Sequence, residues 1–203
     1  MEKKDLKPAG VFKYFEEICQ VPRPSKKEEK MIAYLKAFGA KHNLETKVDE
    51  AGNVLIKKPA TPGKENLQTV VLQSHIDMVC EKNNDVQHDF LTDPIETEID
   101  GEWLKAKGTT LGADNGIGVA TELAILADDS IEHGPLECLF TVDEETGLTG
   151  AFALQEGFMS GDILLNLDSE DEGEIFIGCA GGIDSVAEFT YKEVEVPAGR
   201  SEE

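Results

Sequence analysis

Three short apolar runs in this chain each end directly on a histidine or an acidic residue. The runs and the residues that follow them are Thr69–Ser74 with His75, Leu136–Val142 with Asp143, and Asp162–Leu167 with Asp168. Segments typical of helices separate the runs, and this strand–helix–strand order favours a largely parallel sheet covered by helices. The carboxyl ends of parallel strands meet at one edge of a sheet, so we expect these polar residues to gather there.

The rest of the chain also alternates between helical and strand-like patterns. Patterns typical of helices occur at Val11–Gln20, at residues 26–42 with a capping box of Ser25 and Glu28, at Gly116–Leu126 and at Gly147–Gly157. Hairpins are predicted at Glu45–Lys57 and Ile95–Ala106, and further strands at Glu174–Ile177 and Asp184–Thr190. The predicted fold class is α/β, with a mixed, largely parallel sheet flanked by helices.

Charge and apolar patterning argue against two classes of partner. The net charge is −22, from 19 basic and 41 acidic residues, whereas binding to a phosphate backbone needs clustered Lys and Arg. No window approaches the roughly 20 apolar residues of a membrane span, and the first residues lack the apolar region of a signal peptide. The four cysteines are widely spaced, which favours free thiols in a reducing compartment. We therefore expect a cytoplasmic protein without nucleic-acid or membrane partners.

His75 and Asp77 are the first candidate site residues. Residues two apart on an extended segment face the same side, so the Asp77 carboxylate can accept a hydrogen bond from the imidazole nitrogen that does not bind a metal. Such a bond fixes the tautomer and makes the histidine a better ligand. The pattern by itself also fits a histidine and an aspartate at the start of a loop.

Asp114 lies in a glycine-rich turn in front of a predicted helix. Glycines at positions 112, 116 and 118 allow close approach of the backbone and unusual dihedral angles. The turn has no Gly-Lys-Ser/Thr sequence and no regular dinucleotide fingerprint, so a phosphate loop is not supported. Asp114 is therefore either a metal ligand or a simple N-cap of the helix.

Acidic residues follow both later strands. Asp143, Glu144 and Glu145 are adjacent carboxylates that repel one another, and a bound cation is one physical way to hold them together. One glutamate can then bind the metal while its neighbour faces water, although a solvated acidic turn has the same sequence. Asp168 begins an acidic run, but an EF-hand calcium loop would need an acid where Cys179 stands.

The combined set of candidate ligands points to hydrolytic chemistry. Histidine and carboxylate ligands without a thiolate suit an open catalytic zinc or manganese site better than a structural one. Two such ions would share a bridging carboxylate, activate water and polarise a carbonyl group. A nearby glutamate would take the proton and pass it to the leaving amine.

Four motifs of the chain, taken together, resemble those of a known family. They are Ser74–Val79 (SHIDMV), Leu111–Gly118 (LGADNGIG), Thr141–Gly147 (TVDEETG) and Leu165–Glu170 (LNLDSE). They resemble the motifs of the bacterial aminoacyl-histidine dipeptidases, also called cytosolic non-specific dipeptidases, a carnosinase-like branch of the two-zinc exopeptidases. The resemblance runs from about Leu6 to the last residue.

The resemblance implies a role for each candidate residue. His75 and Asp168 would bind one metal ion, Asp114 would bridge both ions, and Glu145 would bind the second. The remaining two would act on these ligands and on the substrate, with Asp77 orienting His75 and Glu144 as the general base. The two ions would be zinc, with manganese or cobalt as substitutes, and the substrates unblocked dipeptides such as Xaa-His.

The resemblance also implies a domain organisation. Residues 1–183 would form the N-terminal part of a zinc exopeptidase-like catalytic domain, and residues 184–203 would begin an inserted lid that is otherwise missing. In the family the lid also makes a homodimer, and another histidine near the C-terminus completes the second metal site. His42, His88 and His133 match no such motif, so we expect this chain to be the N-terminal portion of such an enzyme.

Two other functions are compatible with the same residues. A deacylase or an aminopeptidase would use the same metal ligands on a different amide substrate. A peptide-binding module without turnover would explain the missing histidine, but it would have no need of a general base at Glu144.

We predict that this chain has a complete first metal site, made by His75, Asp114 and Asp168, and an incomplete second one. Calorimetric titration of the metal-free chain with zinc is expected to show a single tightly bound ion, and Asp114→Ala is expected to abolish that binding. Two bound ions, or robust dipeptide turnover by the chain alone, would contradict the prediction.

Overall fold

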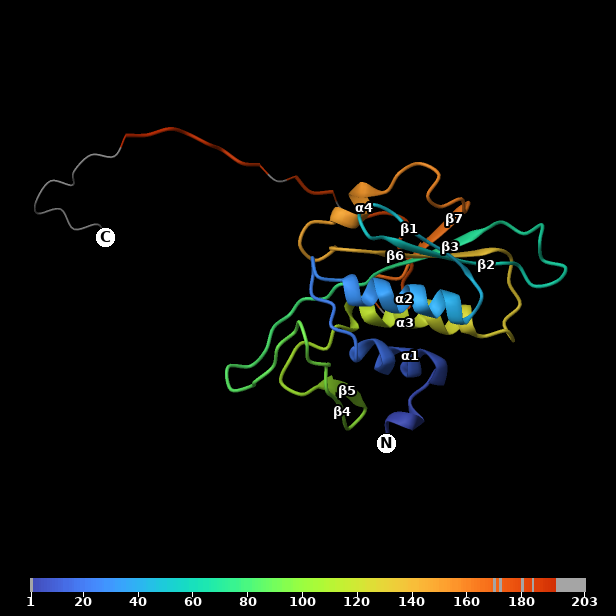
Figure 1. The fold of residues 1–203 in the computed structure, drawn as a ribbon, viewed down its shortest axis with the longest axis horizontal. Coiled ribbons are helices and arrows are strands. Elements are labelled where there is room, and N and C mark those ends of the chain that lie inside the picture. Colours follow the sequence, from blue (N-terminus) through green and yellow to red (C-terminus); the bar gives the residue numbers. More distant parts are fainter. Residues whose placement is uncertain (1, 170, 172, 180, 184, 193–203) are drawn as a thin grey trace, which may run out of the picture. The chain divides into compact units, whose positions relative to one another are not determined.

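A five-stranded sheet is the central element of the computed structural model (Figure 1). Its strands are β1 (Glu45–Val48), β2 (Val54–Lys58), β3 (Val70–His75), β6 (Leu136–Thr141) and β7 (Ile163–Asn166). A separate two-stranded sheet is formed by β4 (Thr97–Asp100) and β5 (Trp103–Ala106). The helices are the short 3-10 helix η1 (Lys3–Asp5), α1 (Ala9–Cys19), α2 (Glu29–Lys41), α3 (Ala113–Ala127) and α4 (Thr149–Ala153).

The structure describes residues 2–169, 171, 173–179, 181–183 and 185–192, and the chain divides into two units. The first unit, Met1–Ser169, holds all the helices and strands found among the described residues. The second unit is Glu170–Glu203. Residues 184 and 193–203 of the predicted lid segment lie outside the described residues, so the predicted boundary after residue 183 stays a prediction.

The strand order in the large sheet is β1-β2-β6-β3-β7. β3 pairs in parallel with both β6 and β7, whereas β2 is antiparallel to β1 and to β6. Four strands of this sheet therefore run in one direction, and β2 runs against them. The prediction of a mixed, largely parallel sheet flanked by helices is confirmed.

Both faces of the sheet are covered, one by helices and the other by the segment that follows α4. On one face α2 contacts β1 and β2 and α3 contacts β3, while α1 packs on α3 on the side away from the sheet (Figure 1). On the other face, side chains that follow α4 contact buried side chains of β2, β3 and β6. These are Leu154, Phe158 and Met159 against Leu55, Val71 and Leu139.

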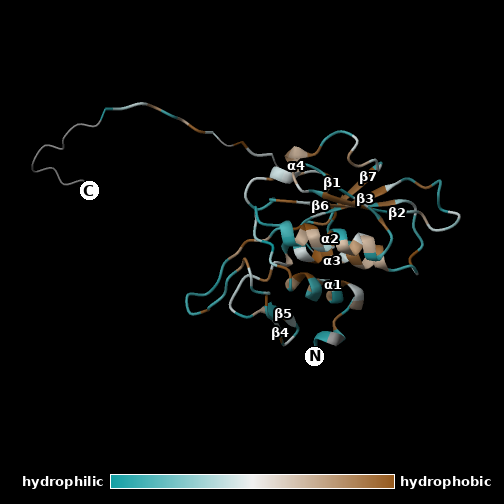
Figure 2. Cartoon of the chain, in the orientation of Figure 1, coloured by the Kyte–Doolittle hydropathy of each residue, from teal (hydrophilic) through white to brown (hydrophobic). Residues whose placement is uncertain are grey.

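Because both faces of the sheet are covered, its central strands appear in the sequence as continuous apolar runs. β6 is buried at each of its positions, and hydrophobic residues are prominent in the strands of the large sheet (Figure 2). A strand that is covered on both faces reads as a continuous apolar run instead of an alternating one.

β7 is an exception, because it forms an open edge of the sheet. Its three aliphatic residues keep 39% (Ile163), 48% (Leu164) and 49% (Leu165) of their surface exposed. An edge strand with exposed apolar side chains is prone to pairing with other chains, so this edge is where aggregation is expected.

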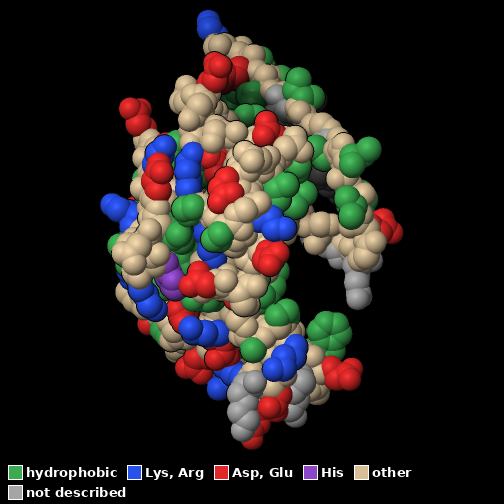
Figure 3. All heavy atoms as spheres, turned by 90° about the vertical axis from the view of Figure 1, so that its right-hand side faces the viewer, with side chains coloured by type: hydrophobic (Ala, Val, Ile, Leu, Met, Phe, Trp, Pro, Cys, Tyr) green, Lys and Arg blue, Asp and Glu red, His purple; other side chains and the backbone are tan. Residues whose placement is uncertain are grey.

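Charged side chains are spread over the surface. Acidic and basic side chains lie interspersed on the face that Figure 3 shows, and exposed ion pairs such as Lys105–Asp100 add little to stability. No helix in the part of the chain that the structure describes combines the length and the apolar character needed to cross a membrane.

Two predictions of local structure are wrong. α2 begins at Glu29, and the Ser25 hydroxyl donates a hydrogen bond to the Asp77 carboxylate (2.7 Å) instead of capping the helix. The strands predicted at Glu174–Ile177 and Asp184–Thr190 are not present in their described residues, and the first residue of the second lies outside these. An apolar run becomes a strand only where a neighbouring strand accepts its backbone hydrogen bonds.

One acidic side chain, Glu122, is fully buried in the middle of α3. The hydroxyl of Ser74, on β3, donates a hydrogen bond of 2.6 Å to its Oε1 atom. Burial raises the pKa of Glu122 well above its ordinary value, and the bond from Ser74 offsets only part of that rise. We therefore expect Glu122 to keep its proton in the folded chain.

The raised pKa of Glu122 predicts a pH effect on stability. Above the pKa of an unfolded glutamate, the folded state holds one more proton at Glu122 than the unfolded state, so the free energy of unfolding falls as the pH rises. Glu122→Gln cannot ionise and removes this fall. In urea denaturation followed by circular dichroism, the variant should therefore gain stability relative to the parent on going from about pH 5 to about pH 8.

The matched control is Glu98→Gln, which changes an exposed glutamate on β4. It should show no comparable change with pH. An equal stability difference at both pH values for Glu122→Gln would mean that folding does not raise the pKa of Glu122.

Candidate metal centre

The predicted site residues come together at the carboxyl edge of the large sheet. His75 is the last residue of β3, Glu144 and Glu145 follow β6, and Asp168 follows β7. Because β3 lies between β6 and β7 and is parallel to both, these residues reach the same edge. Asp114 is delivered by the first turn of α3, which packs on β3.

The side chain of His75 is at the centre of the group and is 1% exposed. Its Nε2 atom faces carboxylate oxygens from three different loops. The distances are 3.0 Å to Asp114 Oδ1, 3.7 Å to Asp168 Oδ2 and 3.9 Å to Glu144 Oε2. Two sets of residues therefore offer ligand atoms within 4.8 Å of one another, namely His75 with Asp114 and Glu145, and His75 with Glu144 and Asp168.

Asp77 lies behind His75 and is fully buried. Its Oδ1 atom is 3.2 Å from His75 Nδ1, as the spacing of the two residues predicts. The backbone N–H groups of Glu144 and Glu145 donate to the same carboxylate, at 3.0 and 3.2 Å. Asp77 thus joins the loop after β3 to the loop after β6, and a proton on Nδ1 leaves His75 Nε2 free for a metal.

The ionisable groups of the cluster shift one another's pKa values. Burial disfavours the charge on His75, but hydrogen bonds to Asp77 and Asp114 outweigh it and raise the pKa of His75 to about 9. Burial likewise disfavours charge on Asp77, yet its hydrogen bonds from His75, Glu144 and Ser25 lower the pKa of Asp77 to about 2. In the metal-free protein His75 therefore carries a proton that a bound metal would displace.

The pKa values of the outer carboxyl groups are raised, in contrast to the lowered pKa of Asp77. Burial raises the pKa values of Glu144, Glu145 and Asp168 above their ordinary values, and neighbouring carboxylates add to the rise. Among the residues that the structure describes, no lysine or arginine forms an ion pair with Asp114 or with any of these three. A half-buried group of carboxylates beside one imidazole, without a paired basic side chain, fits a divalent cation.

A third group of carboxylates, Glu28, Asp77 and Asp143, lies beneath the centre and is buried. Its oxygens are already used within the protein. Asp143 accepts hydrogen bonds from the hydroxyls of Thr146 and Thr149, and Glu28 accepts one from the backbone N–H of Asp143. These bonds hold the loop after β6 in place, so we assign this group a structural role.

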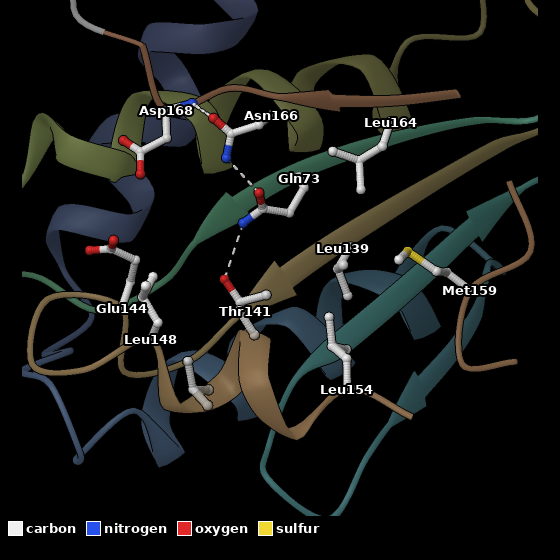
Figure 4. Close-up of a pocket in the computed structure, with 12 residues that line it drawn as sticks. Gln73, Leu139, Thr141, Glu144, Leu148, Leu154, Met159, Leu164, Asn166 and Asp168 are labelled. Carbon is white, nitrogen blue, oxygen red and sulfur yellow. Dashed lines mark hydrogen bonds between the residues drawn. The ribbon is translucent and has the colours of Figure 1, made fainter. Parts of the chain in front are cut away.

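An apolar hollow of about 240 Å³ opens beside Glu144 and Asp168 (Figure 4). Aliphatic side chains make most of its wall, namely Leu139, Leu148, Leu154, Met159 and Leu164. Along the sheet, Asn166 donates to Gln73 (2.6 Å) and Gln73 donates to Thr141 (3.2 Å), so the polar side chains at its base are paired.

Sequence reasoning missed the role of two residues that hold side chains of the site in place. Asn115 donates from Nδ2 to Asp168 Oδ1 (2.7 Å) and to the carbonyl of Leu167 (3.1 Å), which ties the start of α3 to the end of β7. Ser25, taken as a helix cap, donates to Asp77. The place of Asn115 next to Asp114 was the available signal, whereas nothing local distinguishes Ser25 from an ordinary cap.

Comparison with known proteins places the chain in a family. The model of peptidase family M20/M25/M40 matches residues 71–199, which is more than half of the chain, so the chain belongs to this family. It is 52% identical over 198 residues to a protein of Escherichia coli named cytosol non-specific dipeptidase, and the match covers 98% of the chain and 41% of that relative.

Solved structures give the same result for the fold. Aminoacylhistidine dipeptidase from Vibrio alginolyticus is 56% identical with a TM-score of 0.83, over 85% of this chain and 35% of that one. Aminopeptidase PepT from Bacillus cereus is 26% identical with a TM-score of 0.68, over 80% of this chain and 43% of that one. The chain thus spans less than half the length of each of these relatives.

The buried bond between Asp77 and His75 predicts an effect on metal affinity. Asp77→Asn keeps the shape of the side chain but places an amide group among the N–H donors that surround it, so His75 loses its orientation. Loss of such a partner of a ligand typically weakens metal binding by about 10- to 100-fold. Calorimetric titration of the folded variant with zinc measures the change, with the exposed Asp100→Asn as control. An unchanged affinity would show that Asp77 does not support the ligand.

Proposed function

We propose that this chain carries the catalytic metal centre of a metal-dependent dipeptidase that hydrolyses unblocked dipeptides, including Xaa-His. The observation that carries the proposal is the convergence of Asp114, Glu144 and Asp168 on the Nε2 atom of His75, with Asp77 on the opposite nitrogen. The relatives from Escherichia coli and Vibrio alginolyticus, both named as dipeptidases, support the same activity.

The proposed ligand roles are those that the family resemblance implies: His75 and Asp168 would hold one ion, Glu145 would hold the second, and Asp114 would contact both. The two groups around His75, one with Asp114 and Glu145 and the other with Glu144 and Asp168, support a metal centre made by these residues. We propose zinc, with manganese or cobalt as substitutes, because the donors are one imidazole and several carboxylates without a thiolate. When bound, the pair of cations supplies Lewis acidity that activates water and polarises the carbonyl of the peptide bond.

Glu144 is the proposed general base. Its side chain is 32% exposed, its Oε2 atom is 3.9 Å from His75 Nε2, and it lines the apolar hollow, which is where a base for a bound substrate would lie. Burial and the neighbouring carboxylates raise its pKa, which makes Glu144 a better proton acceptor than an ordinary glutamate. The proton taken from the attacking water is then given by Glu144 to the leaving amine.

Three wider properties belong to the same proposal. We place the boundary between the catalytic domain and the lid segment after residue 183. We expect a homodimer when the protein is full length, and a cytoplasmic location, which the name of the Escherichia coli relative supports. The partner is the dipeptide substrate.

A chimera tests the function without relying on the isolated chain. The chain replaces the matching 41% of the Escherichia coli relative, and hydrolysis of free dipeptides is compared with hydrolysis of N-acylated amino acids in the presence of zinc. We expect turnover of the free dipeptides. Glu144→Gln in the chimera should reduce kcat by about 10²- to 10⁴-fold with little loss of zinc binding.

The exposed Glu98→Gln is the control, because it changes a glutamate on the distant hairpin. Preferential hydrolysis of N-acylated amino acids would assign a deacylase instead. A folded, zinc-binding chimera without any turnover would favour a peptide-binding module.

A further inference from the structure

Arg23 lies in the segment between α1 and α2 and is 2% exposed. In the sequence its place between Pro22 and Pro24 marks only a break between two helices. In the structure its guanidinium reaches the loops that carry the metal centre. Arginine is rarely buried to this degree without partners, so its contacts require an explanation.

All three hydrogen bonds of the guanidinium go to backbone carbonyls. Nη1 donates to the carbonyls of Ile76 (3.1 Å) and Asp77 (3.0 Å), which directly follow His75. Nη2 donates to the carbonyl of Gly112 (2.5 Å), two residues before Asp114. One rigid, planar group therefore joins the loop of His75 to the loop of Asp114.

The glycines of the turn make room for this group. Gly112 has a φ of +68°, and a Cβ atom there would lie 2.5 Å from Arg23 Nη2 and 2.8 Å from the sulfur of Met78. A Cβ atom at Gly116 would lie 2.7 Å from the same nitrogen. The close approach of the guanidinium is therefore a second physical reason for glycine at positions 112 and 116, on either side of Asp114.

The rest of the segment strengthens the connection. The backbone N–H of Met78 donates to the carbonyl of Arg23 (3.2 Å), and the Ser25 hydroxyl donates to Asp77. Glu28 accepts a hydrogen bond from the N–H of Asp143, at the start of the loop after β6. Residues 23–28 therefore contact three of the loops that supply site residues.

The charge of Arg23 also suits this place. Burial lowers its pKa, but a guanidinium stays protonated in proteins, and Asp77 and Glu145 are among the groups that favour its charge. A fixed positive charge beneath the carboxylates reduces their mutual repulsion before any cation binds.

We propose that Arg23 is a positioning residue for the metal centre, whose guanidinium holds the loops of His75 and Asp114 at ligand distance in the metal-free protein. The proposal deepens the proposed function and rests on it only for the role of the metal. Lysine cannot replace arginine here, because an ammonium group lacks the planar fork that reaches both loops at once.

The decisive comparison uses Arg23→Lys and Arg23→Met in the 203-residue chain, with Lys57→Met as control. Lys57 is also a largely buried cation, but it pairs with Glu137 at the opposite edge of the sheet. Zinc affinity is measured by calorimetry and folding by thermal denaturation. Both Arg23 variants are expected to bind zinc about 10- to 100-fold more weakly, whereas Lys57→Met loses stability and keeps the affinity of the parent. Folded Arg23 variants with the parental affinity would overturn the proposal.

Hydrogen exchange of the unsubstituted chain tests the proposal even if the variants do not fold. The backbone N–H groups of Ile76, Met78 and Gly116 lie in the two loops and donate to the carbonyls of Thr141, Arg23 and Gly112, so their exchange reports on the order of the loops. We expect them to be protected in the metal-free chain nearly as well as in the presence of zinc. Protection that develops only with zinc would refute preorganisation by Arg23. If the parent chain binds no zinc but these amides are protected, the proposed function fails, while the order of the loops without metal, which the proposal for Arg23 requires, stands.

Discussion

The parallel pairing of β3 with β6 on one side and β7 on the other is the constraint on which the whole arrangement depends. The register aligns His75 with Thr141 of β6 and Gln73 with Asn166 of β7, so the polar residues beyond each strand meet at one edge. Side chains alternate between the two faces of a sheet, and a shift of one residue would turn His75 to the other face. The apolar runs resist such a shift, because β6 is buried along its whole length under helices on one face and the residues after α4 on the other.

The same pairing brings several carboxylates close together, and other contacts in the fold offset their mutual repulsion. Backbone N–H groups and His75 surround Asp77, while Arg23 holds a positive charge beneath Asp77 and Glu145. Asp143 turns away from its neighbours with a left-handed backbone (φ +50°) and is held by two threonine hydroxyls, so only Glu144 and Glu145 face His75. Among the described residues, the carboxylates that remain around His75 have no lysine or arginine as an ion-pair partner, and such a group fits a divalent cation.

Much of this could be predicted from the sequence, because the signals are local. The runs at residues 69–74, 136–142 and 162–167 became β3, β6 and β7, and no boundary is shifted by more than one residue. The predicted contact between His75 and Asp77 is present, since two residues along an extended chain fix it. Local signals failed where a distant partner decides the outcome. Ser25 followed by Glu28 has the pattern of a capping box, but the Ser25 hydroxyl binds Asp77, 52 residues away.

The sequence by itself determined which segments become buried strands, which residue types stand at their ends, and therefore the class of chemistry at that edge. Hydrophobic periodicity, which indicates burial, extends over only a few residues, so it can be recognised in the sequence. Only the tertiary structure decided the order β1-β2-β6-β3-β7, the distances around His75 Nε2, and the union of two loops by the guanidinium of Arg23. Such contacts join residues between 39 and 89 positions apart in these examples, and their energies exist only once the chain has packed, so no local pattern records them.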